Sequence, residues 1–121
     1  MSGRYLQVLQ RMQSLGKQAL CINAIVASEL AYGVAKSAPQ FQAKNKLQLQ
    51  KFLNSVELLE WPSAAMWTYG QVRNRLKVAG QPIAEMDLLI GVHALHTGLT
   101  VVTNNTREFE RIEGLKLENW V

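Results

Sequence analysis

Three segments of the sequence each place a carboxylate just beyond an apolar run. Glu29 follows the run that ends at Asn23 and falls in the first turns of an expected helix. Asp87 stands near the start of another expected helix, directly before apolar residues. Glu108 follows the apolar run that ends at Thr103. The chain holds nine acidic residues, and Asp87 is its one aspartate, so a site made of several carboxylates must use glutamates.

Gathered carboxylates would bind a hard divalent cation. Burying unpaired carboxylates is costly, and neighbouring ones raise one another's pKa values. A cation such as Mg²⁺ or Mn²⁺ removes both costs, because it prefers oxygen ligands. The alternative is that each carboxylate only stabilises the N-terminus of a helix, where negative charge is favourable. For any single segment, the spacing favours that second interpretation.

The elements that would position these carboxylates alternate between strands and helices. Periodic apolar residues predict helices over 4–15, 24–37, 42–54, 62–79 and 84–97, and a short helix or turn over 105–111. Short apolar runs predict strands over 19–23, 56–60, 99–103 and 115–117. Strands separated by helices indicate an α/β layer fold with a mainly parallel sheet. Sites in such sheets form beyond the carboxyl ends of strands, which here means after Asn23 and Thr103.

The composition indicates one globular domain spanning 1–121. With 48% apolar and 18% charged residues, the chain has the balance of a folded rather than a disordered protein. The lone Cys21 cannot form an internal disulfide, which favours a cytoplasmic location, and its apolar neighbours predict a small buried side chain. No apolar run approaches the length of a membrane span, and the N-terminus lacks the core of a signal peptide.

The formal net charge of +4 permits nucleic-acid binding without requiring it. The sequence contains two loose groups of basic residues, which are Lys44, Lys46 and Lys51, then Arg73, Arg75 and Lys77. Either group could engage backbone phosphates, in which case binding would weaken steeply with salt. Solvated helix faces have the same composition, so the charge by itself leaves both interpretations open.

Other chemistries find little support. His93 and His96 have a spacing seen in zinc sites, but no cysteine or second histidine pair supplies further ligands. The sequence has no glycine-rich phosphate loop of the Walker type. Ser28 and Ser63 lack the sequence context of a catalytic nucleophile.

Taken in order, the three acidic segments resemble the PIN-domain family, and specifically its VapC-like branch of bacterial toxins. The resemblance runs from about residue 4 to Val121. It is carried by Ser28-Glu29-Leu30 with Gly33, by Gly80-x-Pro82-Ile83 with Asp87, by Thr103-Asn104-Asn105-Thr106-Arg107-Glu108-Phe109, and by the ending Glu118-Asn119-Trp120. It implies a three-layer α/β/α fold with a mainly parallel sheet, in which acidic residues hold Mg²⁺ or Mn²⁺ and RNA phosphodiesters are hydrolysed.

The same resemblance assigns roles to individual residues. Glu29, Asp87 and Glu108 fall on the second, third and fourth acidic positions of the family and would be the metal ligands and catalytic residues. Asn105 would be a neutral neighbour of Glu108, while Thr103 and Asn104 would shape the loop beneath the metal. Arg73 would contact a substrate phosphate, or it is simply an exposed helix residue.

The resemblance also implies partners. These are a structured RNA, often tRNA, and a small antitoxin whose tail occupies the acidic cleft. An arginine in that tail would pair with the carboxylates in a bidentate manner. Tyr32, Phe41, Phe52 and Trp67 would either form the docking groove or pack in the core. A homodimer is expected as well, and no membrane is involved.

One feature departs from the family pattern. Family members open with a short central strand that ends in Asp-Thr-Asn and supplies the first metal ligand, whereas here residues 1–5 lead straight into the first expected helix. The sequence therefore predicts an N-terminally truncated domain whose exposed neighbouring strands, 19–23 and 99–103, favour instability or self-association. The alternative function is a catalytically inactive remnant that only binds an antitoxin or RNA.

Overall fold

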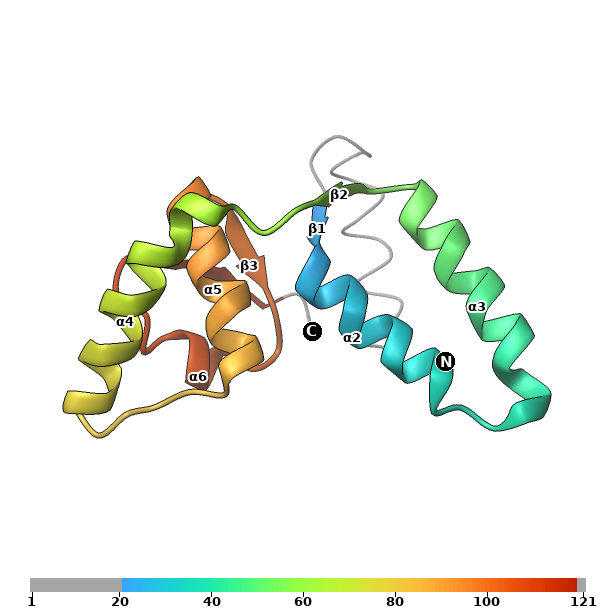
Figure 1. Cartoon of the computed structure of the whole chain (residues 1–121), viewed down its shortest axis with the longest axis horizontal. Coiled ribbons are helices and arrows are strands. Elements are labelled where there is room, and N and C mark those ends of the chain that lie inside the picture. Colours follow the sequence, from blue (N-terminus) through green and yellow to red (C-terminus); the bar gives the residue numbers. More distant parts are fainter. Residues whose placement is uncertain (1–20, 120–121) are drawn as a thin grey trace. The chain divides into compact units, whose positions relative to one another are not determined.

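The computed structural model describes residues 21–119, which form two compact units, residues 21–60 and 61–119 (Figure 1). The helix predicted over 4–15 lies outside the described residues. No helix among residues 21–119 is both long enough and apolar enough to cross a membrane. The single-domain organisation expected from the sequence stays a prediction.

The first unit is a helical hairpin joined to a pair of parallel strands. Its elements are β1 (Cys21–Asn23), α2 (Ala24–Ala35), α3 (Pro39–Asn54) and β2 (Glu57–Leu59). Ile22 of β1 is in register with Leu58 of β2. The side chain of Asn23 caps α2 by accepting a 2.8 Å hydrogen bond from the Val26 amide, which ends the strand and begins the helix at one residue.

One glutamine side chain bridges the connection between α2 and α3, in addition to the backbone hydrogen bonds there. The Gln42 side-chain amide donates to the carbonyl oxygens of Ala35 and Ser37, each at 3.1 Å, and so satisfies groups at the end of α2. Pro39 occupies the first turn of α3, where its missing N–H costs nothing. This proline explains why α3 begins at residue 39, three residues before the predicted start.

The second unit packs two long helices against a second pair of parallel strands. Its elements are a short 3₁₀ helix η2 (Ser63–Ala65), α4 (Met66–Val78), α5 (Glu85–Thr97), β3 (Thr100–Val102), α6 (Thr106–Phe109) and β4 (Lys116–Glu118). Val101 of β3 is in register with Leu117 of β4. Gly98, with φ 76°, ends α5 in the left-handed conformation that glycine adopts without strain.

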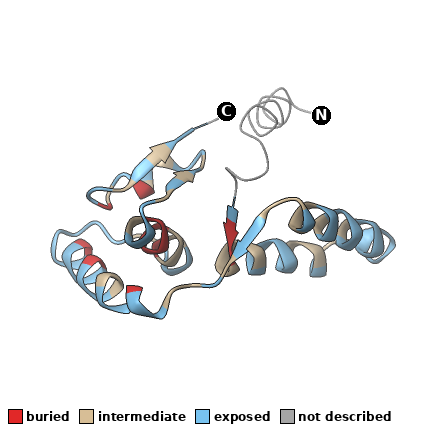
Figure 2. Cartoon of the chain, turned by 90° about the horizontal axis from the view of Figure 1, so that it is seen from above, coloured by how far each residue is buried: buried red, intermediate tan, exposed pale blue. Residues whose placement is uncertain are grey.

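The main core lies in this second unit, as the burial colours in Figure 2 show. Its buried residues are Ala65, Val72, Leu76, Leu88, Val92, Phe109 and Ile112. A side chain on Gly91 would collide with the end of the Ile112 side chain, so α5 and the segment after α6 approach closely because Gly91 has none.

Most of the predicted elements are confirmed, with two differences besides the start of α3. All described strand pairs are parallel, as expected for the α/β class: β1 pairs with β2 in one unit, and β3 pairs with β4 in the other. The helix predicted over 62–79 is split into η2 and α4. The prediction that Cys21 is buried is wrong: its side chain is exposed, because it begins a three-residue strand whose burial starts only at Ile22.

Candidate metal centre

Asp87 stands in the first turn of α5, where the sequence places it. Ala84, the residue just before the helix, has a non-helical ψ of 139°, so the helix begins directly afterwards. Asp87 is half-buried, and the next residue, Leu88, belongs to the core. Its charge is favourable there because the N-terminus of a helix carries partial positive charge.

Glu108 lies in a hydrogen-bonded turn that begins where β3 ends. The backbone N–H of Thr103 donates to the carbonyl oxygen of Glu118, at 3.1 Å, which ties the turn to β4. The Thr103 hydroxyl accepts from the Asn105 amide at 3.0 Å, and the Asn105 side chain donates to Glu108 Oε2 at 3.1 Å. The Glu108 carboxylate is therefore oriented by Asn105. Asn104, which lies between Thr103 and Asn105 in the sequence, is exposed.

Asp87 and Glu108 belong to one packed unit. Helices α5 and α6 are in contact, and Phe109 lies in the core beside Gly91. The Arg111 guanidinium donates to the carbonyl oxygen of Pro82 at 2.8 Å, which joins the segment after α6 to the one before α5. The turn with Glu108 is thus fixed to the region from which α5 starts.

Glu29 belongs to the other unit. It is exposed on α2, a turn and a half beyond the capping residue Asn23. The convergence of Glu29 with Asp87 and Glu108 therefore stays a prediction. Among residues 21–119, no group of three or more histidine, cysteine, aspartate or glutamate side chains is placed to hold a metal ion. The carboxylate oxygens of Asp87 and Glu108 nevertheless have the chemistry that a hard divalent cation requires.

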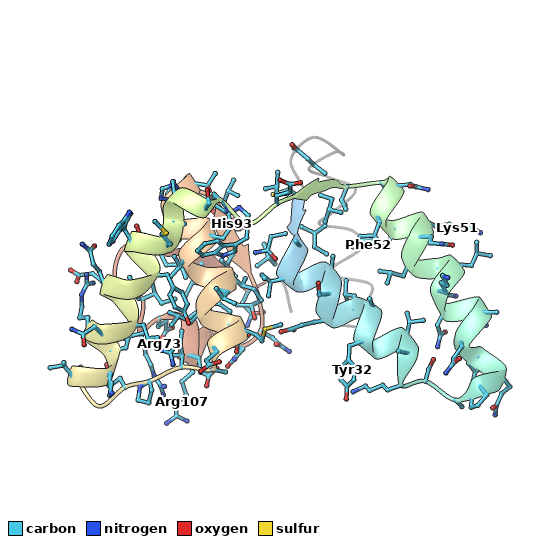
Figure 3. The ribbon with its side chains drawn as sticks, viewed as in Figure 1. Tyr32, Lys51, Phe52, Arg73, His93 and Arg107 are labelled. Atoms are coloured by element: carbon cyan, nitrogen blue, oxygen red, sulfur yellow. The ribbon has the colours of Figure 1, made fainter. Side chains whose placement is uncertain are left out.

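Arg73 is engaged within its own unit (Figure 3). Its guanidinium donates to the Tyr69 hydroxyl at 3.0 Å and to Glu85 Oε1 at 3.1 Å, and it lies 5.9 Å from the centre of the Tyr69 ring. The Tyr69 ring meets Trp61 edge to face. The pairing with Glu85 had no sequence signal, because the two residues lie twelve apart on different helices. A phosphate-binding role for Arg73 stays a prediction.

The four aromatic residues that were expected either in a docking groove or in the core differ in how exposed their side chains are. Tyr32 and Trp67 are 67% and 73% exposed, and Phe41 is also exposed, so these three do not pack in the cores of their units. Phe52 is half-buried, on the side of α3 nearer to α2 (Figure 3). The exposed three remain available to a partner.

His93 is buried in α5 and gives the protein a pH-dependent stability. Burial disfavours the charged imidazolium, and repulsion by His96 adds to this, so the pKa of His93 lies below its ordinary value of 6.5. The unfolded chain therefore binds a proton at this position more readily than the folded one does. Stability is fully present above the unfolded pKa and is lost as the pH falls below it.

We expect the free energy of unfolding, measured with urea between pH 7.5 and 5, to fall below pH 6.5 with a slope of up to about 1.4 kcal/mol per pH unit from this group. His93→Gln should flatten that decline, whereas His96→Gln, at an exposed position, should retain most of it. Equal slopes in all three proteins would show that His93 is not the cause.

The comparisons with known proteins agree with this architecture. The model of the PIN domain family matches residues 4–115. The chain therefore belongs to the PIN-domain family. It is 38% identical over 107 residues to the tRNA(fMet)-specific endonuclease VapC of Shigella flexneri, covering 88% of this chain and 80% of that protein.

Two further relatives point to the same branch. The chain is 42% identical over 101 residues to ribonuclease VapC2 of Rickettsia felis, covering 84% of this chain and 74% of that protein. The crystal structure of DNA-bound VapBC from Salmonella typhimurium superposes with a TM-score of 0.87 at 36% identity, covering 95% of this chain and 85% of that one. Ribonucleases of this type generally depend on a divalent metal.

Proposed function

We propose that the chain is a metal-dependent endoribonuclease toxin of a toxin–antitoxin pair, which hydrolyses phosphodiester bonds in tRNA or another structured RNA. The observation that carries the proposal is the turn in which Asn105 orients Glu108, in the same unit as Asp87. The proposal is also supported by relatives that match most of the chain and are named endonucleases or ribonucleases.

The metal would be Mg²⁺ or Mn²⁺, held by Asp87, Glu108 and Glu29. When bound, such a cation stabilises the negative charge that develops on the phosphate during hydrolysis. The chain itself would hold the carboxylates of Asp87 and Glu108 in position. Asn105 would restrain Glu108 with its hydrogen bond, and the first turn of α5 would position Asp87. Thr103, and Asn104 beside it, would shape the loop beneath the metal.

The partner would be a small antitoxin, as in the VapBC complex to which the chain is similar. An arginine of the antitoxin would occupy the carboxylate site, because guanidinium and carboxylate groups pair in a bidentate manner. Tyr32, Phe41 and Trp67 are exposed and would contribute docking contacts. We further propose a homodimer and a cytoplasmic location, where the tRNA substrates named for the relatives are found.

A second candidate is an inactive protein that retains only the binding surfaces. It is favoured by the finding that neither described unit by itself, residues 21–60 or 61–119, contains a group of three ligands placed to hold a metal. This protein would bind the antitoxin or RNA and would leave RNA intact.

The test combines metal binding with cleavage of a bacterial initiator tRNA by the full chain. We expect calorimetry to detect Mn²⁺ binding, and we expect discrete tRNA fragments with Mg²⁺ or Mn²⁺ but none with a chelator. Added antitoxin should suppress the fragments. Metal binding or tRNA binding without any cleavage would favour the inactive protein, and cleavage that persists with chelator would exclude the proposed chemistry.

A further inference from the structure

The outer face of α3 carries a stripe of side chains that donate hydrogen bonds. Gln40, Lys44, Gln48 and Lys51 recur every three or four residues, so they lie on one face of the helix. All four side chains are exposed. Figure 3 shows Lys51 on the other side of α3 from Phe52, which lies nearer to α2. We refer to these four residues as the α3 stripe.

The positive charge of the α3 stripe is not neutralised locally. Residues 30–56 contain no aspartate or glutamate. Within residues 21–119, neither Lys44 nor Lys51 makes an ion pair. The two ammonium groups can therefore pair with an anionic ligand. Their flexible side chains allow each ammonium group to reach such a ligand without rearrangement of the helix.

Two of the three basic residues of α4, the arginines, differ in this respect. Arg73 lies 3.1 Å from Glu85, and Arg75 lies 3.5 Å from Glu113. Both pairs are exposed, so they contribute little to stability, but each carboxylate competes with a phosphate for the guanidinium. Of the two basic groups in the sequence, the one on α3 is thus better prepared to bind a polyanion.

The spacing of the α3 stripe suits a phosphate backbone. Lys44 and Lys51 are seven residues apart, which is about 10.5 Å along a helix axis. Two point charges at this separation can contact phosphates of one strand, and glutamine amides commonly donate to phosphate and sugar oxygens. Leu47 lies beside the stripe and is 52% exposed, which is ordinary for a single surface leucine.

We propose that the α3 stripe is a docking surface for the sugar–phosphate backbone of RNA, separate from the carboxylates that would cut it. The surface reads charge and backbone shape rather than base sequence, because it offers flexible donors and no rigid pocket. This inference rests on the proposed ribonuclease function for the identity of the polyanion. It assigns backbone binding to α3 rather than to Arg73.

The test measures the binding of fluorescently labelled bacterial initiator tRNA to the full chain in chelator, where no metal-dependent cleavage occurs. The double variant Lys44→Gln/Lys51→Gln should bind about tenfold more weakly at 0.1 M salt. The slope of log affinity against log salt should decrease by about 1.4–1.8, which corresponds to two lost phosphate contacts. Circular dichroism should show unchanged helix content, since all four stripe positions are exposed.

The matched control is Lys36→Gln/Lys116→Gln, which removes the same charge from exposed positions at the end of α2 and in β4, outside both basic groups. It should change the tRNA affinity by less than about twofold. An equal loss in both double variants would overturn the proposal, because overall charge would then explain it. Unchanged affinity in the Lys44/Lys51 variant, or no affinity in the unmodified chain, would overturn it as well.

Two readouts separate this proposal from the proposed function. A Lys44/Lys51 variant that binds tRNA weakly, in a chain that never cleaves with metal, would support the α3 stripe and reject the nuclease. Normal tRNA cleavage together with unchanged tRNA binding in the Lys44/Lys51 variant would support the nuclease and reject the α3 stripe as an RNA-docking surface. If the variant loses affinity for polyglutamate but not for tRNA, the stripe serves an acidic protein and the RNA assignment is wrong.

Discussion

Asp87→Asn should lower the rate of metal-dependent tRNA cleavage by about a hundredfold or more, which is about 2.7 kcal/mol in the barrier. The substitution keeps the shape of the side chain and removes the negative charge that attracts the cation. Mn²⁺ affinity measured by calorimetry should fall together with the rate. Loss of charge at the helix terminus should cost only about 0.3–1 kcal/mol of stability, so the variant should remain folded.

The control for this substitution is Glu110→Gln. Glu110 is an exposed carboxylate two residues beyond Glu108, and its loss changes the net charge by the same amount. Its cleavage rate and Mn²⁺ affinity should stay within about twofold of the unmodified chain, as expected for an exposed charge. If Asp87→Asn cleaved tRNA as fast as Glu110→Gln does, Asp87 would not be a catalytic residue.

Phe109→Ala should lower the free energy of unfolding by about 3–5 kcal/mol. Phe109 is only 3% exposed and packs beside Gly91 and Ile112, where α6 meets α5. The alanine would leave a cavity at a contact that also fixes the turn with Glu108. Because a small domain has about 5–15 kcal/mol of stability in total, the melting temperature should fall markedly.

The same truncation at an exposed position provides the comparison. Phe41→Ala removes an identical group from a side chain that is 53% exposed in α3, and it should cost less than about 1 kcal/mol. Urea denaturation of both variants measures the difference. Similar losses at the two positions would mean that Phe109 does not hold the core of the second unit together.

The local features of the fold could be predicted from the sequence, since they depend on neighbouring residues. Apolar residues at helical spacing identified α2 and α5 closely, and Gly98 marked the end of α5. The order of the acidic segments identified the family. The start of α3 was missed, although Pro39 was a usable signal for it.

The tertiary structure alone decided which side chains are already engaged. The ion pair of Arg73 with Glu85 and the bond from Arg111 to Pro82 join residues 12 and 29 apart in sequence. The exposure of Cys21 likewise depends on what packs beside it, and not on its apolar neighbours in the chain. Sequence periodicity reports the faces of single elements, whereas contacts between elements depend on how those faces meet. The sequence therefore determined the family and the candidate carboxylates. Packing between elements decided that the two arginines of α4 are paired, whereas within residues 21–119 Lys44 and Lys51 of α3 make no ion pair.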